Sequence, residues 1–197
     1  MKILNCYAGI GGNRKEWGSE HDITAVEIEP RIAAIYSDLY PGDTVIVGDA
    51  HQYLLENYHN FDFIWTAPPC PTHGQYRYNV GFRAKGYRAV YPDMTLYQEI
   101  IFLQYHAKGL YAVENVISYY EPLIKPKKLG RHYIWANFEI PDARFGAANI
   151  RSKNKISDFD LDLSAYDVPN KRQILRNCTS DGVGLHILNA AMQWGAL

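Results

Sequence analysis

The chain of 197 residues is 47% hydrophobic and 21% charged, which is enough to bury one core and predicts a single domain spanning 1–197. Its formal net charge of −1 excludes a uniformly basic surface, so any nucleic-acid site must be a local patch. The three widely spaced cysteines, the lack of a leader and the lack of an apolar run of about 20 residues predict a cytoplasmic protein without disulfides, metal centre or membrane contact.

The first half of the chain alternates short apolar runs with amphipathic stretches, a pattern typical of βαβ units. Strands are predicted at 2–6, 23–27, 44–47 and 61–66, alternating with helices that begin near Asn13 and span 32–39 and 50–57. The second half predicts a helix at 94–108, a strand at 110–113, strands within 130–148 and a closing helix at 182–194, with irregular segments at 71–92 and 152–170. We therefore expect an α/β fold with a mostly parallel sheet, helices on both faces and ligands at the carboxyl ends of the strands.

A glycine-rich turn, Tyr7-Ala8-Gly9-Ile10-Gly11-Gly12, follows the first predicted strand, and such a turn lets a ligand approach the backbone closely. Glu27 ends the second strand, where a carboxylate can accept hydrogen bonds from both hydroxyls of a ribose. Asp49 ends the third strand and could accept one from an adenine amino group. Together they predict an adenosine site. Taken singly, the glycines suit any tight turn or a dinucleotide pyrophosphate, and each acid suits a helix N-cap.

Cys70 follows two prolines at the end of the fourth predicted strand, and Glu114 ends the fifth. Prolines hold the backbone stiffly, which suits a nucleophile, although a buried apolar cysteine would fit the same position. A thiolate is favoured by nearby cations, for which Arg77, His73 and Arg151 are candidates. If the thiolate adds to C6 of a pyrimidine, a carboxyl group at N3 and the 4-amino group would stabilise the charge that develops on the ring.

In chain order, these segments resemble the motifs of the cytosine-5 DNA methyltransferases. The turn at 7–12 resembles the first motif, Ala25-Val26-Glu27-Ile28-Glu29 the second and Gly48-Asp49-Ala50 the third. Pro68-Pro69-Cys70 resembles the motif that holds the nucleophile, and Glu114-Asn115-Val116 the motif that holds the acid.

Two later segments extend the resemblance. Phe145-Gly146-Ala147-Ala148-Asn149-Ile150-Arg151 is similar to the family segment whose arginine contacts the target base. Arg176-Asn177-Cys178-Thr179 is similar to the last motif, where an asparagine completes the cofactor pocket. The chain departs from the family pattern at Pro71, where glutamine is usual, and at Ala148 and Asn149, where proline and glutamine are usual.

The resemblance implies a Rossmann-like methyltransferase fold, S-adenosylmethionine (SAM) as methyl donor, 5-methylcytosine as product and a target base flipped out of its duplex. It implies catalytic roles for Cys70, Glu114 and Arg151. The SAM site that it implies consists of Tyr7, Ala8, Gly9, Ile10, Gly11, Gly12, Glu27, Ile28, Asp49, Ala50, Pro68 and Asn177.

Family members read DNA sequence with a large region between the last two motifs, but here that interval, about 152–171, is too short for a folded domain. Contact with DNA is instead predicted from the stretch 75–91, which carries aromatic residues, no acid, and the basic residues Arg77, Arg83, Lys85 and Arg88. Its aromatic side chains could equally pack on the core. We expect relaxed or short specificity, unless a second copy or a partner subunit reads the sequence, and such a compact form suits a phage enzyme.

Two other functions stay open. The same chemistry could act on cytosine in tRNA or in a free nucleotide, because neither substrate needs a DNA-reading region. The chain could also be a catalytically silent SAM-binding subunit that assists a partner, although a silent subunit has no chemical need for Cys70, Glu114 and Arg151.

Overall fold

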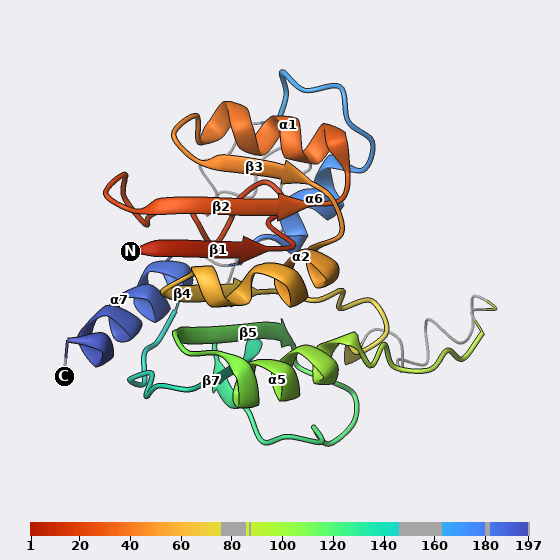
Figure 1. The fold of residues 1–197 in the computed structure, drawn as a ribbon. Coiled ribbons are helices and arrows are strands. Elements are labelled where there is room, and N and C mark those ends of the chain that lie inside the picture. The colour runs from red at the N-terminus through yellow and green to blue at the C-terminus, as the bar shows by residue number, and fades with distance from the viewer. Residues whose placement is uncertain (76–85, 87, 146–162, 180–181, 197) are drawn as a thin grey trace.

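The computed structural model describes residues 1–75, 86, 88–145, 163–179 and 182–196. Across these residues a seven-stranded sheet has the order β3-β2-β1-β4-β5-β7-β6 (Figure 1). Its strands are β1 (Lys2–Cys6), β2 (Asp22–Glu27), β3 (Thr44–Val47), β4 (Phe63–Thr66), β5 (Leu110–Val116), β6 (Lys127–Leu129) and β7 (His132–Ala136). Neighbours from β3 to β5 are parallel, whereas β7 runs antiparallel to both β5 and β6.

The first five strands follow the doubly wound order 3-2-1-4-5, so the chain reverses direction across the sheet between β1 and β4. The register sets Cys6 beside Thr66 and Thr66 beside Val113, which aligns the carboxyl ends of β1 and β4, while β5 continues past them to Val116. The predicted α/β fold is confirmed. The point of reversal is where ligands bind in open sheets of this type.

The helices cover both faces of the sheet, as predicted. They are α1 (Pro30–Leu39), α2 (Ala50–Asn57), α5 (Thr95–His106), α6 (Lys171–Asn177) and α7 (Val183–Gly195), with a short 3₁₀ turn η1 (Tyr58–Asn60). Figure 1 shows α2 and α5 together on the near face. In the part of the chain described, no helix combines the length and the apolar character needed to cross a membrane.

The two halves of the core follow from the alternation of side chains along β4, all of whose residues are buried. Phe63 and Trp65 point to one face and pack with residues of α7 such as Ile187. Ile64 points to the opposite face and packs with Leu54 of α2 and Ile100 of α5. A central parallel strand must be apolar on both faces, which explains why β4 reads as a continuous hydrophobic run.

The predicted helix near Asn13 is wrong. The segment instead forms successive tight turns, in which Arg14 N donates to Gly11 O at 3.0 Å and Trp17 N donates to Arg14 O at 3.0 Å. Gly11 and Gly18 both have φ of 78°, so too few residues lie between them for a helix. The Arg14 side chain forms a bidentate ion pair with Asp43, with nitrogen to oxygen distances of 2.8 and 3.0 Å.

Candidate functional site

The glycine-rich turn after β1 has an unusual backbone. Tyr7, Gly9 and Gly11 have φ of 56°, 55° and 78°, a region that favours glycine and strains tyrosine. A Cβ on Gly11 would collide with the Tyr40 ring, so that glycine is required for packing. A Cβ on Gly9 would meet no described atom within 4 Å, so this part of the turn faces open space.

Glu27 braces this turn from the end of β2. Its Oε2 accepts from Gly9 N at 2.9 Å, and its Oε1 accepts from Glu29 N at 2.9 Å. The next residue, Ile28, is 68% exposed at the rim of the sheet. The structure thus brings Glu27 and Gly9 together, as predicted from their positions at neighbouring strand ends.

Asp49 is the N-cap of α2, which was the structural alternative for this acid. Its Oδ1 accepts from His51 N at 2.9 Å and from Gln52 N at 3.2 Å. The following Ala50 is buried, and its carbonyl oxygen lies 3.8 Å from Cys6 Sγ. Both hydrogen bonds of the cap use the same carboxylate oxygen of Asp49, and the residue is exposed.

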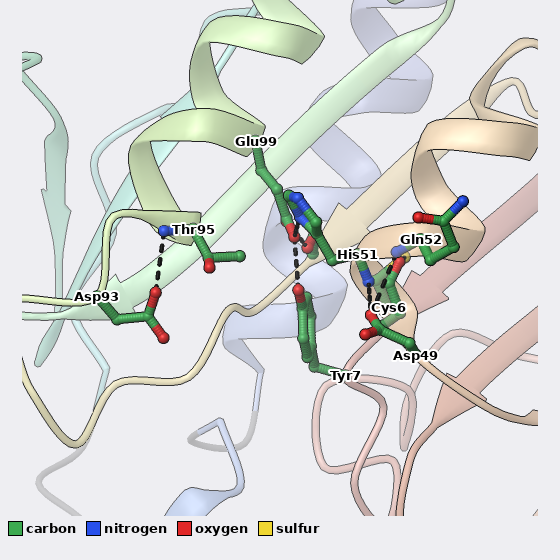
Figure 2. Close-up of polar contacts among 10 residues, drawn as sticks. Cys6, Tyr7, Asp49, His51, Gln52, Asp93, Thr95 and Glu99 are labelled. Atoms are coloured by element: carbon green, nitrogen blue, oxygen red, sulfur yellow. Dashed lines mark hydrogen bonds and ion pairs between the residues drawn. The ribbon is translucent and has the colours of Figure 1, made fainter.

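Glu99 of α5 is a site residue that the sequence did not reveal. It is 1% exposed and accepts from Tyr7 Oη at 2.6 Å and from Thr66 Oγ1 at 2.5 Å, while His51 Nδ1 lies 3.0 Å away. Figure 2 shows the Tyr7 and His51 side chains converging on Glu99 from two different turns. Burial, followed by the charge of Glu99, raises the pKa of Tyr7 above its ordinary value of 10.0, so Tyr7 is a hydrogen-bond donor at all ordinary pH.

Cys70 is half-buried at the end of the segment that follows β4. Asn115 of β5 fixes this segment, because its Nδ2 donates to the buried carbonyl oxygen of Pro68 at 2.9 Å. Burial, and then the charge of Glu114, raises the pKa of Cys70 above its ordinary value of 9.0. The thiol is therefore protonated in the free protein, and Glu114 is close enough to contribute to this.

His73 does not supply the predicted cation beside Cys70. The imidazole is fully buried, its Nδ1 lies 2.5 Å from Tyr120 Oη, and burial lowers its pKa below 6.5. A neutral imidazole carries no positive charge that could stabilise the thiolate form of Cys70. His73 instead has a structural role, since its backbone N–H donates to Cys70 O at 3.0 Å.

Glu114 lies within β5, opposite Ile134, and not after the strand as predicted. The residue is 6% exposed. Thr179 Oγ1 donates to Oε2 at 2.8 Å, and His132 Nδ1 of β7 lies 3.3 Å from Oε1. Thr179 belongs to the segment predicted to complete the pocket, whereas no sequence signal pointed to His132.

The segment before α7 packs against the glycine-rich turn, but not through Asn177. That side chain is exposed and accepts from Gln173 Nε2 at 2.7 Å within α6, a helix that was not predicted. Contact with the turn comes from Cys178, whose Cβ would be 2.5 Å from a Cβ on Gly12. Arg131 Nη2 donates to Cys178 O at 2.9 Å and ties the same segment to β7.

Several predicted residues lie outside the described part of the chain. They are the basic residues Arg77, Arg83 and Lys85, the proposed base-contacting Arg151, and most of the interval 152–171. Arg88 is described and is exposed.

No family model matches the sequence, and no curated protein matches it. Among solved structures, the chain is similar to a conserved hypothetical protein of Streptococcus pyogenes, with 16% identity, a TM-score of 0.46, and coverage of 68% of this chain and 83% of that one. It is also similar to the putative methyltransferase yhhF of Escherichia coli, with 16% identity, a TM-score of 0.44, and coverage of 68% and 73%. A DNMT2 mutant of Spodoptera frugiperda shows 25% identity and a TM-score of 0.39 over 58% of this chain and 35% of that one. All three likenesses are partial, so the functional conclusion rests on the residues of this chain.

Proposed function

We propose that this protein is a SAM-dependent methyltransferase that attacks C6 of a cytosine in DNA with Cys70 and methylates C5. The supporting observation is the grouping at one rim of the sheet. Gly9, after β1, donates to Glu27 at the end of β2, while the charge of Glu114 in β5 contributes to the raised pKa of Cys70 after β4. An open backbone turn beside a thiol and a buried carboxyl group suits methyl transfer to a ring carbon.

The residues of the glycine-rich turn fit a nucleoside cofactor. Gly9 has no side chain to occupy the open space beside the turn. Each carboxylate oxygen of the neighbouring Glu27 accepts one backbone hydrogen bond and has a second lone pair that can accept another. Asp49 Oδ2 remains for an adenine amino group. When bound, SAM would supply a methyl group on a positively charged sulfur. The residues proposed to hold it are Tyr7, Ala8, Gly9, Ile10, Gly11, Gly12, Glu27, Ile28, Asp49, Ala50, Pro68 and Asn177.

The proposed reaction uses Cys70 as the nucleophile and Glu114 as the acid. The Cys70 thiol gives its proton to solvent, its sulfur bonds to C6, and N3 of the ring receives a proton from Glu114, which leaves C5 rich in electrons. C5 then takes the methyl group from bound SAM, and cleavage of the bond between that group and the cofactor sulfur leaves a neutral thioether. Solvent takes the C5 proton, the electron pair of the bond to that proton re-forms the C5–C6 double bond and expels the Cys70 thiolate from C6, and the proton on N3 returns to Glu114. Since the charge of Glu114 helps to raise the Cys70 pKa, a protonated Glu114 also favours the thiolate that attacks.

DNA is the proposed substrate because the basic and aromatic stretch 75–91 suits phosphate contact and stacking on a flipped base. Arg77, Arg83, Lys85 and Arg88 are proposed to contact DNA, and Arg151 to contact the base. With only a short interval at about 152–171, the monomer is expected to select a short sequence or none, and a second copy or a partner subunit would supply longer readout.

The test is incubation with tritiated SAM and a duplex that contains 5-fluorocytosine. Fluorine on C5 cannot leave as a proton does, so the wild-type protein should form a covalent complex through Cys70. Cys70→Ser should form none, whereas Cys178→Ser should still form it, because a serine hydroxyl can replace the buried Cys178 thiol at its 3.6 Å contact with Ile174 O. Parallel assays with duplex DNA, tRNA and dCMP identify the substrate. Absence of the adduct together with full methyl transfer by Cys70→Ser would exclude this mechanism.

A further inference from the structure

We propose that His132 and Thr179 are positioning residues that clamp the Glu114 carboxyl group, and that His132 determines whether this group holds the proton needed at N3. The inference rests on the proposed function, because it assigns partners to the acid of that reaction. Thr179 lies in the segment that resembles the last motif, where no role was assigned to its side chain, and His132 lies in none of the motifs.

Thr179 holds one oxygen of the carboxyl group. Its hydroxyl donates to Oε2 of Glu114 at 2.8 Å, and both residues are at most 6% exposed. A buried hydroxyl that donates to a carboxylate fixes the rotation of the carboxyl plane, because water cannot replace the bond. Thr179 is itself held by the backbone of the preceding residue, since Cys178 O accepts from Arg131 Nη2 at 2.9 Å.

His132 approaches the other oxygen from β7. Its Nδ1 lies 3.3 Å from Oε1, and the whole residue is 8% exposed. The contact is not aligned as a hydrogen bond, and among the described residues no other group bonds to this nitrogen. A buried ring nitrogen without a partner is costly, so a small rotation that aligns it with Glu114 would be favourable.

The charges around His132 make it sensitive to pH. Burial lowers the pKa of His132 below 6.5, the nearby Glu114 acts to raise it, and the positive Arg131 acts to lower it. Cys70 is the further titratable group that interacts with Glu114 among the described residues. The ring is therefore neutral near pH 7. A proton added at lower pH would place a positive charge beside Glu114, stabilise its carboxylate form and remove the proton that N3 requires.

The decisive experiment compares the pH dependence of kcat for methyl transfer in wild type and His132→Asn. Asparagine places an amide near the position of Nδ1 but does not titrate. Wild-type kcat should fall as the pH drops below about 6.5, the ordinary histidine value, and His132→Asn should retain its rate to lower pH. Thr179→Val should lower kcat about tenfold, the loss of one buried hydrogen bond, with KM for SAM unchanged, and Thr179→Ser should restore it. The proposal is overturned if kcat falls over the same range of low pH in His132→Asn as in wild type.

A second measurement separates this inference from the proposed reaction. Nuclear magnetic resonance titration of the His132 ring needs no substrate, and Glu114→Gln should lower its pKa further, because the carboxylate that raises it is gone. If the wild-type protein transfers no methyl group but the pKa of His132 shifts in Glu114→Gln, the contact between His132 and Glu114 exists and the proposed function is wrong. If the pKa of His132 is the same in Glu114→Gln and in wild type, the proposed clamp on Glu114 is wrong, whatever the methyl-transfer activity.

Discussion

Glu99 is a buried acid whose partners come from three separate segments of the chain. Tyr7 follows β1, Thr66 ends β4 and His51 opens α2, and all three lie within 3.0 Å of its oxygens. A carboxylate removed from water is stable only where donors replace the lost hydration, and two hydroxyl groups and an imidazole do so here. The same bonds fix the strained Tyr7 at the entrance to the glycine-rich turn.

Replacing Glu99 by glutamine should weaken both the fold and the proposed cofactor site. Glutamine keeps the shape but presents an amide N–H₂ where a donor from Tyr7, Thr66 or His51 needs an acceptor. We expect a loss of about 1–3 kcal/mol in the free energy of unfolding. SAM binding, measured by isothermal titration calorimetry, should weaken in parallel. The matched control is Gln104→Glu, the reverse exchange at an exposed position of α5. Unfolding in urea that is the same for Glu99→Gln and wild type would contradict this role.

The placements of Glu27 at the end of β2 and of Cys70 after β4 could be predicted because each stands next to a recognisable local pattern, whereas Glu114 lies within β5 and not beyond its end. Glu99 could not be predicted, since its partners are separated from it by 92 and 33 residues along the chain. Thr179 is likewise 65 residues from Glu114. Contacts of this kind depend on how the strands are ordered in the sheet, which local hydrophobic patterns do not specify.

The closing helix α7 is held against the glycine-rich segment by positions that admit no side chain. A Cβ on Gly184 of α7 would collide with the carbonyl oxygen of Asn13, and a Cβ on Gly12 would meet Cys178 just before the helix. The amphipathic pattern predicted this helix correctly, but the requirement for close approach is visible only in the packed molecule. The tight turns that replace the expected helix near Asn13 belong to the same contact.

Gly12→Ala should therefore destabilise the protein and loosen the segment that carries Thr179. The added methyl group would lie 2.5 Å from Cys178 Cβ, so the backbone must shift, at a cost of about 1–3 kcal/mol. The measurement is thermal unfolding. Gly42→Ala is the control, because a Cβ there meets no atom within 4 Å and its melting temperature should stay close to wild type. Equal melting temperatures for the two variants would show that the contact with Cys178 is not needed.

Two buried histidines, His73 and His132, are neutral near pH 7 in the described part of the molecule. Burial lowers the pKa of His73 and His132 below 6.5, the value that applies when the chain is unfolded. The stability that these groups provide is complete above pH 6.5, where both histidines are neutral in the folded and in the unfolded protein. It is lost as the pH falls toward their lower pKa values in the folded protein. Below pH 6.5 the unfolded chain binds protons at these histidines, whereas the folded protein does not yet bind them.

The free energy of unfolding should thus decrease on acidification from pH 7.5 to 5.5. Each buried histidine contributes a slope of up to about 1.4 kcal/mol per pH unit. His73→Asn should remove one such contribution, although it will lower stability at neutral pH because the contact with Tyr120 is lost. The exposed His59 provides the control, and His59→Asn should keep the wild-type slope. Urea unfolding at several pH values measures both. An unchanged slope in His73→Asn would contradict the assignment.

The sheet itself was predictable in outline, because β1 to β5 are apolar runs bounded by turns. The position of β7 between β5 and β6 was not, since antiparallel insertion depends on pairing across the whole sheet. That insertion is what brings His132 beside Glu114.

Asn115 gives β5 a further property. It is the neighbour of Glu114 in the strand, and its bond to Pro68 O anchors the segment that carries Cys70. Successive side chains of a strand project to opposite sides, so one peptide unit links the carboxyl group to the tether of the thiol. Any sliding of β5 relative to the rest of the sheet would carry both groups in the same direction. Their separation is therefore set by one peptide unit of β5, by the hydrogen bond from Asn115 to Pro68 O, and by the two residues between Pro68 O and the thiol.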